Sequence, residues 1–66
     1  MQSAHRAWTL YQGRREIDTV FYDRNCSPEY VARGLQEHDG LRFDRMESEG
    51  TIYDAAGRPL YHTRKA

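Results

Sequence analysis

Residues 27–40 read SPEYVARGLQEHDG and decide the fold, because they carry the signals that begin and end a helix. Ser27 offers a hydroxyl that caps a first turn, and Pro28 suits the first helical position, where its missing N–H costs nothing. Gly40 readily adopts the left-handed conformation that ends many helices. We therefore predict a helix over residues 28–39.

The predicted helix has a narrow apolar stripe, with Val31 and Leu35 one turn apart. Such a stripe indicates that one face packs on a sheet while the opposite face contacts water. Gly34 costs about 1 kcal/mol relative to alanine inside a helix. A close approach of the helix to the sheet at Gly34 is the expected reason for its presence.

Two alternating segments precede the helix, at residues 6–12 and 16–22, and Gly13 breaks the pattern between them. Alternation rich in aromatic and β-branched residues predicts strands, and a short glycine-containing turn between them predicts a hairpin. The turn places Tyr11 opposite Glu16. With regular pairing beyond that point, one face of the hairpin carries the core residues Trp8, Leu10, Ile17 and Phe21.

Further strands are expected after the helix. Residues 41–46 alternate between apolar and charged, which predicts a strand, and residues 47–50 are expected to form a loop. Residues 54–57 (DAAG) fit a type I turn followed by a glycine bulge, which closes a hairpin with Ile52 near Leu60 and Thr51 near Tyr61. Pro59 cannot donate a ladder hydrogen bond, so the last strand is expected at an edge of the sheet.

These elements predict one α+β domain over residues 1–66, in which an antiparallel sheet of four to five strands carries one helix on one face. The predicted order is β-β-α-β-β, with a further strand if residues 41–46 pair separately, and residues 1–5 and 63–66 are expected to fray. The opposite face of the sheet has no cover within the chain. The predicted core is Trp8, Leu10, Ile17, Phe21, Val31, Leu35, Leu41, Phe43, Ile52 and Leu60.

Composition limits the class of protein. The chain has 66 residues, a formal net charge of zero and one cysteine, Cys26. Zero net charge gives no global field toward nucleic acid or an anionic membrane, and no apolar run approaches the ~18 residues that span a bilayer. A secreted domain of this size usually needs several disulfides, so we expect a cytoplasmic protein with no membrane partner.

No convergent catalytic or metal site is visible. Cys26 precedes the helix, where the dipole favours a thiolate, but no histidine has a spacing that would make it the base. His38 suits a helix C-terminus and lacks a second ligand at helical spacing. The acids of residues 47–50 are interpreted as a solvated loop. We expect no enzyme activity, no cofactor and no metal.

Tyrosines and arginines form the candidate binding surface. On the predicted registers, the tyrosines lie on the sheet face opposite the core, and arginines lie nearby. Such a face resembles a single-strand nucleic-acid stacking platform, and equally a protein interface; it is also compatible with ordinary surface strands. Zero net charge favours a protein partner, with nucleic acid second, and a homodimer would also cover the face. The candidate residues are Tyr11, Tyr22, Tyr53, Tyr61, Arg14, Arg15, Arg24 and Arg58.

The segment GRREIDTVFY at residues 13–22, followed by Tyr30, Val31 and Leu35 and by HDG at residues 38–40, resembles small uncharacterised proteins encoded by phages and plasmids. The resemblance covers about half of the chain and supplies no functional residues. It implies a non-enzymatic inhibitor or adaptor of host machinery. We expect a protein-interaction module that binds through the tyrosine-rich sheet face or an edge strand, with a nucleic-acid-binding domain as the alternative.

Overall fold

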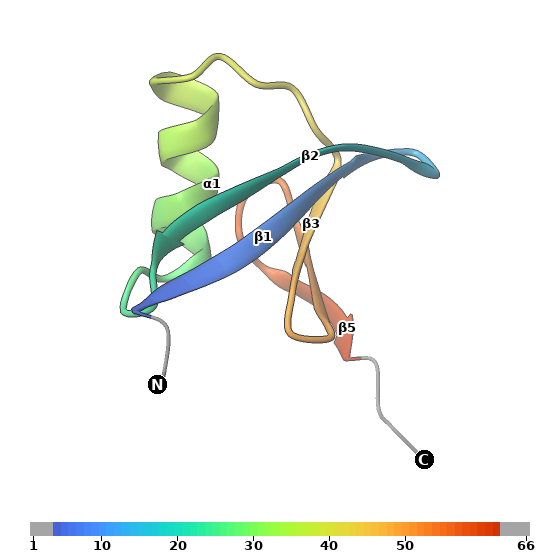
Figure 1. The fold of residues 1–66 in the computed structure, drawn as a ribbon. Coiled ribbons are helices and arrows are strands. Elements are labelled where there is room, and N and C mark those ends of the chain that lie inside the picture. Colours follow the sequence, from blue (N-terminus) through green and yellow to red (C-terminus); the bar gives the residue numbers. More distant parts are fainter. Residues whose placement is uncertain (1–3, 63–66) are drawn as a thin grey trace.

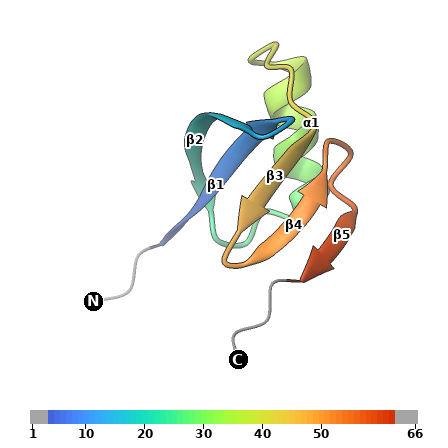
Figure 2. The same ribbon diagram turned by 90° about the vertical axis from the view of Figure 1, so that its right-hand side faces the viewer.

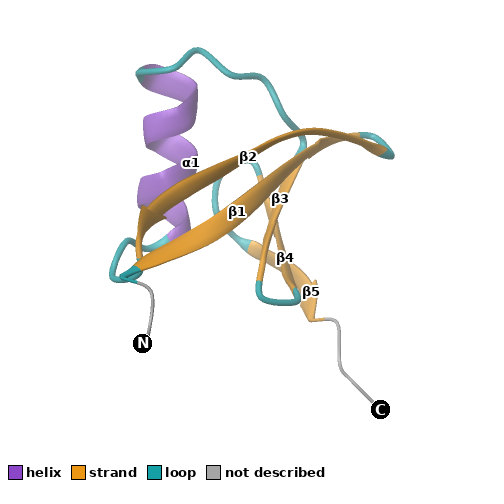
Figure 3. Ribbon diagram, in the orientation of Figure 1, coloured by secondary structure: helices purple, strands orange, loops and turns teal. Residues whose placement is uncertain are grey.

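The computed structural model describes residues 4–62, without the side chains of residues 61 and 62. It contains one helix and one antiparallel sheet of five strands, in the sheet order β2-β1-β3-β4-β5 (Figures 1 and 3). The prediction of a small α+β fold is therefore confirmed. In sequence order the elements are β1 (His5–Gln12), β2 (Arg15–Asp23), α1 (Pro28–Glu37), β3 (Arg45–Ser48), β4 (Thr51–Asp54) and β5 (Pro59–His62).

The ends of the sequence were expected to fray. β1 already includes His5, and the Ala4 carbonyl accepts a hydrogen bond from the Arg24 N–H at 3.0 Å. Residues 1–3 and 63–66 lie outside the described part of the chain.

The ends of α1 follow the capping signals. The Ser27 hydroxyl accepts a hydrogen bond from the Tyr30 N–H at 3.1 Å, and Pro28 occupies the first turn. Gly40 has a φ of +64°, in the left-handed region. The helix ends at Glu37, two residues before the predicted end, because the chain already turns through His38 and Gly40 to let the Leu41 N–H bond the Leu35 carbonyl at 3.0 Å.

The helix lies against one face of the sheet (Figure 2). Its buried residues, Val31, Ala32 and Leu35, belong to the same cluster as Trp8 and Leu10 of β1. The predicted close approach at Gly34 is confirmed, because a Cβ built there would lie 3.1 Å from the Tyr22 hydroxyl oxygen. A side chain at position 34 would thus push Tyr22 away from the helix.

The register of β1 and β2 differs from the prediction after its first pairs. Tyr11 lies opposite Glu16 as expected, but a β-bulge then pairs Leu10 with Asp18 instead of Ile17. Because a bulge adds one residue to one strand, it turns every later side chain of that strand to the other face. Val20 and Tyr22 therefore pack against the core, whereas Ile17 and Phe21 are exposed and were wrongly assigned to it.

The segment predicted as a loop, residues 47–50, contains the end of β3 and a two-residue turn. Glu49 and Gly50 form this turn with φ values of +53° and +85°, as the turn best matched to strand twist requires. A glutamate is not a usual turn signal, so the sequence pattern did not show it. The shorter connection pairs Met46 with Tyr53 and turns Tyr53 toward the core.

The turn between β4 and β5 forms at the predicted residues. The Gly57 N–H donates to the Asp54 carbonyl at 2.9 Å, and the Asp54 N–H donates to the Arg58 carbonyl at 2.8 Å. Another bulge then pairs Ile52 with Tyr61 rather than with Leu60. Leu60 is consequently exposed and was wrongly assigned to the core.

The observed core lies between the helix and the inner face of the sheet. Leu41 packs against it only in part, and Ile52 is buried outside the main cluster. Met46, which the prediction omitted, is completely buried. The main cluster is Trp8, Leu10, Val31, Ala32, Leu35, Phe43 and Met46.

Candidate protein-binding edge

The four tyrosines of the predicted binding face do not share one face. Tyr22 and Tyr53 are half-buried on the helix side of the sheet, and the Tyr53 ring lies 5.6 Å from the Trp8 ring. Tyr11 pairs with Arg45 on the opposite face. The side chain of Tyr61 lies outside the described part. The predicted common face is therefore wrong for the tyrosines that the structure describes, because the bulge in β2 and the tight turn at residues 49–50 turn Tyr22 and Tyr53 toward the core.

Tyr11 belongs to a polar group on the outer face. Its hydroxyl donates to Glu47 Oε1 at 3.1 Å, and the Arg45 guanidinium lies over its ring at 5.3 Å and donates to the Gly13 carbonyl. Burial raises the pKa of Tyr11 above its ordinary value, and the hydrogen bond to Glu47 raises it further. The Tyr11 hydroxyl thus remains protonated and holds neighbouring strands together.

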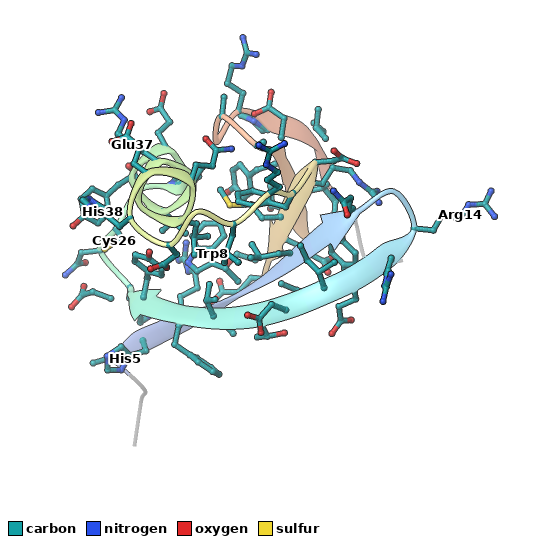
Figure 4. All side chains as sticks on the ribbon, turned by 90° about the horizontal axis from the view of Figure 1, so that it is seen from above. His5, Trp8, Arg14, Cys26, Glu37 and His38 are labelled. Atoms are coloured by element: carbon teal, nitrogen blue, oxygen red, sulfur yellow. The ribbon has the colours of Figure 1, made fainter. Side chains whose placement is uncertain are left out.

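The predicted arginines are dispersed. Arg14 projects from the hairpin tip (Figure 4), and Arg15 follows it at the start of β2. Arg24 Nη2 lies 3.2 Å from Glu49 Oε1, and Arg58 Nε lies 3.2 Å from Asp54 Oδ2. The four arginines thus lie on three parts of the fold: the β1–β2 hairpin, the turn that follows β2, and the turn between β4 and β5.

β2 forms one open edge of the described sheet. β2 pairs only with β1, and seven of its nine residues are exposed. Phe21 is 68% exposed. Such an aromatic side chain beside an unpaired strand edge is a typical feature of a surface that binds another chain.

The direction of the backbone groups on β2 follows from one hydrogen bond. The Arg24 N–H donates to the carbonyl of Ala4, its register partner. Since antiparallel pairs alternate between bonded and non-bonded, Tyr22 and Val20 bond to β1. The backbone N–H and C=O groups of Thr19, Phe21 and Asp23 consequently point to the open edge.

Part of this edge is already protected. The Thr19 N–H donates to the side chain of its neighbour Asp18, with an N···O distance of 2.8 Å. The Asp23 carbonyl accepts from the Cys26 N–H at 3.0 Å, and the bulge near Ile17 disrupts the other end. Bulges and local capping of this kind hinder pairing with other strands. The accessible backbone is therefore centred on Phe21.

The helix forms a flank of the same edge. Tyr30 of α1 is 62% exposed, and its ring meets the Tyr22 ring edge-on with centroids 6.4 Å apart. Burial raises the pKa of Tyr22, with a further increase from the Asp39 carboxylate. Two hollows lie beside this pair. One of about 110 Å³ is lined by Tyr22, Tyr30, Arg33, Gly34 and His38, and one of about 400 Å³ by Asp23, Asn25, Cys26, Ser27 and Tyr30.

We refer to the exposed backbone at Phe21, the Phe21 side chain and the Tyr22–Tyr30 pair as the β2 edge site. Neither exposed aromatic is among the predicted site residues, because the expected register puts Phe21 in the core and Tyr30 appears only in the resemblance to phage and plasmid proteins. One signal was available. Both alternating sets of β2 side chains contain apolar residues. Apolar side chains therefore had to face outward whichever set covers the core.

The groups considered for chemistry lie near this edge but are not assembled for it. Cys26 is half-buried before α1, and His38 caps the other end of the helix (Figure 4). Among the side chains that the structure describes, no three from His, Cys, Asp or Glu are grouped so that they could hold a metal ion. The described helix is not long and apolar enough to cross a membrane.

Comparison of the chain with protein-family models, with curated proteins and with solved structures finds no match.

Proposed function

We propose that this chain is a non-enzymatic protein-interaction module that binds an extended segment of a partner protein along the open edge of β2. The observation that supports the proposal is the position of Phe21 and Tyr30. These two side chains, 68% and 62% exposed, flank the same strand edge from opposite sides of the sheet. Aromatic anchors of this size dominate the energetics of protein interfaces.

An added strand would use the backbone at Phe21. The outward N–H and C=O of Phe21 would supply main-chain hydrogen bonds, as in other cases of strand addition. Successive side chains of the partner would alternate between the two faces. One set of partner side chains would contact Phe21 on the outer face. The other set would enter the hollow of about 110 Å³ that Tyr22 and Tyr30 line. The protected positions at Thr19 and Asp23 limit the added strand to a few residues.

The resemblance to phage and plasmid proteins suggests that host proteins are the first partners to test. Capture from a host lysate, with and without nuclease, would use the wild type and the Phe21→Ala variant. Leu60→Ala is a matched control, since Leu60 is also an exposed apolar residue but lies on β5 at the opposite edge of the sheet. Each captured partner would then be purified and titrated against all three proteins.

We expect Phe21→Ala to weaken the purified complex by at least about 2 kcal/mol, the loss typical of an aromatic anchor. Leu60→Ala should leave the affinity unchanged, and neither variant should unfold. Equal loss in both variants, or no loss in either, would contradict the proposal.

Two further measurements separate the other partners. Sedimentation of the purified chain tests self-association, because the purified sample offers no partner other than a second copy of the chain. Titration of random single-stranded RNA and DNA at two salt concentrations tests nucleic acid; binding tighter than about 1 μM that weakens steeply with salt would favour that alternative.

A further inference from the structure

Glu49 has an unusual backbone conformation. It is the non-glycine residue for which the described chain shows a positive φ, at +53°. A residue with a Cβ adopts this conformation at a cost, and asparagine, aspartate or glycine usually takes the position. The turn between β3 and β4 therefore carries a glutamate where its backbone favours another residue.

The Glu49 carboxylate lies between two arginines. Its Oε1 atom is 3.2 Å from Arg24 Nη2 and 3.7 Å from Arg6 Nε. The first distance is a hydrogen bond, whereas the second is an ion pair that is too long for one. Arg6 lies near the beginning of β1 and Arg24 directly follows β2, so one carboxylate bridges segments far apart in sequence.

Three polar atoms on the described strands β1 and β3 are buried without a hydrogen-bond partner. Arg6 Nε, Trp8 Nε1 and Ser48 Oγ have no hydrogen-bond partner in the described part of the chain. Trp8 is completely buried and Ser48 is 4% exposed. Buried polar atoms of this kind usually bind protein, water or a ligand, because leaving them unpaired is costly.

The register places these groups in one corner of the inner face. Arg6 and Trp8 are two residues apart on β1, and the pairing of Thr9 with Glu47 puts Ser48 beside Trp8 on β3. The Arg6 guanidinium lies over the Trp8 ring at 5.9 Å. Figure 4 shows Trp8 between the helix and the sheet. These unpartnered polar atoms thus lie on β1, which carries Arg6, and on β3, which leads directly into the turn at Glu49.

We propose that this corner is a binding site for an oxyanion, a carboxylate or phosphate group, and that Glu49 occupies it as an internal competitor. Guanidinium groups bind such oxyanions through charge-assisted hydrogen bonds. When an external anion replaces the Glu49 carboxylate, Arg6 and Arg24 bind it, and the Ser48 hydroxyl, which already lacks a partner in the described part of the chain and directly precedes Glu49, would be a further donor. The site is independent of the β2 edge site, since it uses neither Phe21 nor Tyr30.

The test uses Trp8, because the chain has one tryptophan and its indole N–H therefore gives a single NMR signal. Inorganic phosphate and acetate are titrated into the wild type and Glu49→Gln, with sodium chloride at matched ionic strength. We expect the Trp8 indole signal to shift with phosphate and acetate but not with chloride. Glu49→Gln should bind about two- to fivefold more tightly, the range that an exposed ion pair is worth.

Two arms keep the test decisive. Glu37→Gln removes an exposed acid at the far end of α1 and should behave as the wild type. Arg24→Gln, added to Glu49→Gln, should abolish the shift, and it removes a partly exposed side chain whose loss does not empty the core. A Trp8 signal that stays unchanged in Glu49→Gln, or that moves equally with chloride, would overturn the proposal and leave the corner to internal water. A shift unaffected by Arg24→Gln would also overturn it.

Discussion

Replacing Gly57 by alanine tests how the last hairpin packs on the helix. Gly57 has a φ of +85°, and a Cβ built there would lie 2.5 Å from the Cα and 2.6 Å from the backbone N of Glu29. Both contacts are with backbone, which cannot rotate away as a side chain can. The left-handed conformation costs an ordinary residue about 1–2 kcal/mol, and overpacking costs about 1–3 kcal/mol. We therefore expect Gly57→Ala to lose about 2–5 kcal/mol of unfolding free energy.

Gly13→Ala is the matched control. Gly13 has a similar φ of +64°, but nothing lies within 4 Å of a Cβ built there. It should lose only the conformational part, about 1–2 kcal/mol. Both substitutions reduce the entropy of the unfolded chain in the same way, so this contribution cancels in the comparison.

Thermal unfolding followed by circular dichroism measures the difference. In a domain of this size, 1 kcal/mol corresponds to about 4–8 °C in Tm, so Gly57→Ala should melt at least about 4 °C below Gly13→Ala. Equal melting temperatures would refute the packing of the β4–β5 turn against the start of α1.

The remaining predictions concern the core, the turn and the free thiol. Leu35→Ala should lose about 2–5 kcal/mol of unfolding free energy, because it empties the centre of a small core; an unchanged Tm would contradict the packing of the helix. Asp54 accepts hydrogen bonds from the Arg58 N–H and the Ala56 N–H, and these lower its pKa below the ordinary value of 3.8. Because the pKa of Asp54 is lower in the folded state, the stabilising effect of its carboxylate is complete above pH 3.8 and is lost as pH falls through the lower folded pKa. Asp54→Asn should therefore flatten the acid part of the stability–pH curve. A curve unchanged by Asp54→Asn would contradict this role of Asp54. Cys26→Ser should preserve partner affinity, whereas abolished binding in a folded variant would reinstate a reactive cysteine.

Local signals predicted the helix and its neighbouring turns well. The N-cap, the proline and Gly40 act through their own backbone geometry, so the ends of the helix could be found to within two residues. The turn at residues 54–57 depends on Asp54 and Gly57 in the same way. These features require no knowledge of distant contacts.

The faces of the strands could not be predicted from alternation. In β2, one alternating set holds Ile17 and Phe21 and the other holds Val20 and Tyr22, so either can cover the core. In the structure the second set faces the core: Tyr22 packs over Gly34, and Val20 packs on the core cluster. The bulge at Ile17 permits the register that places them there. Such tertiary contacts are absent from the local pattern.

The same uncertainty altered the candidate site. Reversing β2 and β4 turned Tyr22 and Tyr53 inward and exposed Phe21, so the predicted tyrosine face became an aromatic strand edge. The turn at Glu49 contributed, because a glutamate with positive φ gives no sequence signal for a tight hairpin. The edge-strand interpretation depends only on which strand lies outermost in the sheet, and it remains as the proposed site.

Amide hydrogen exchange at Phe21 tests the central claim, that the open edge of β2 binds the partner. The Phe21 N–H points to solvent in the free chain, whereas the Tyr22 N–H bonds to β1. We predict rapid exchange at Phe21 and slow exchange at Tyr22 in the free protein, and protection of Phe21 once a purified partner is bound. A Phe21 amide that is slow in the free chain, or that stays rapid in the complex, would contradict the account.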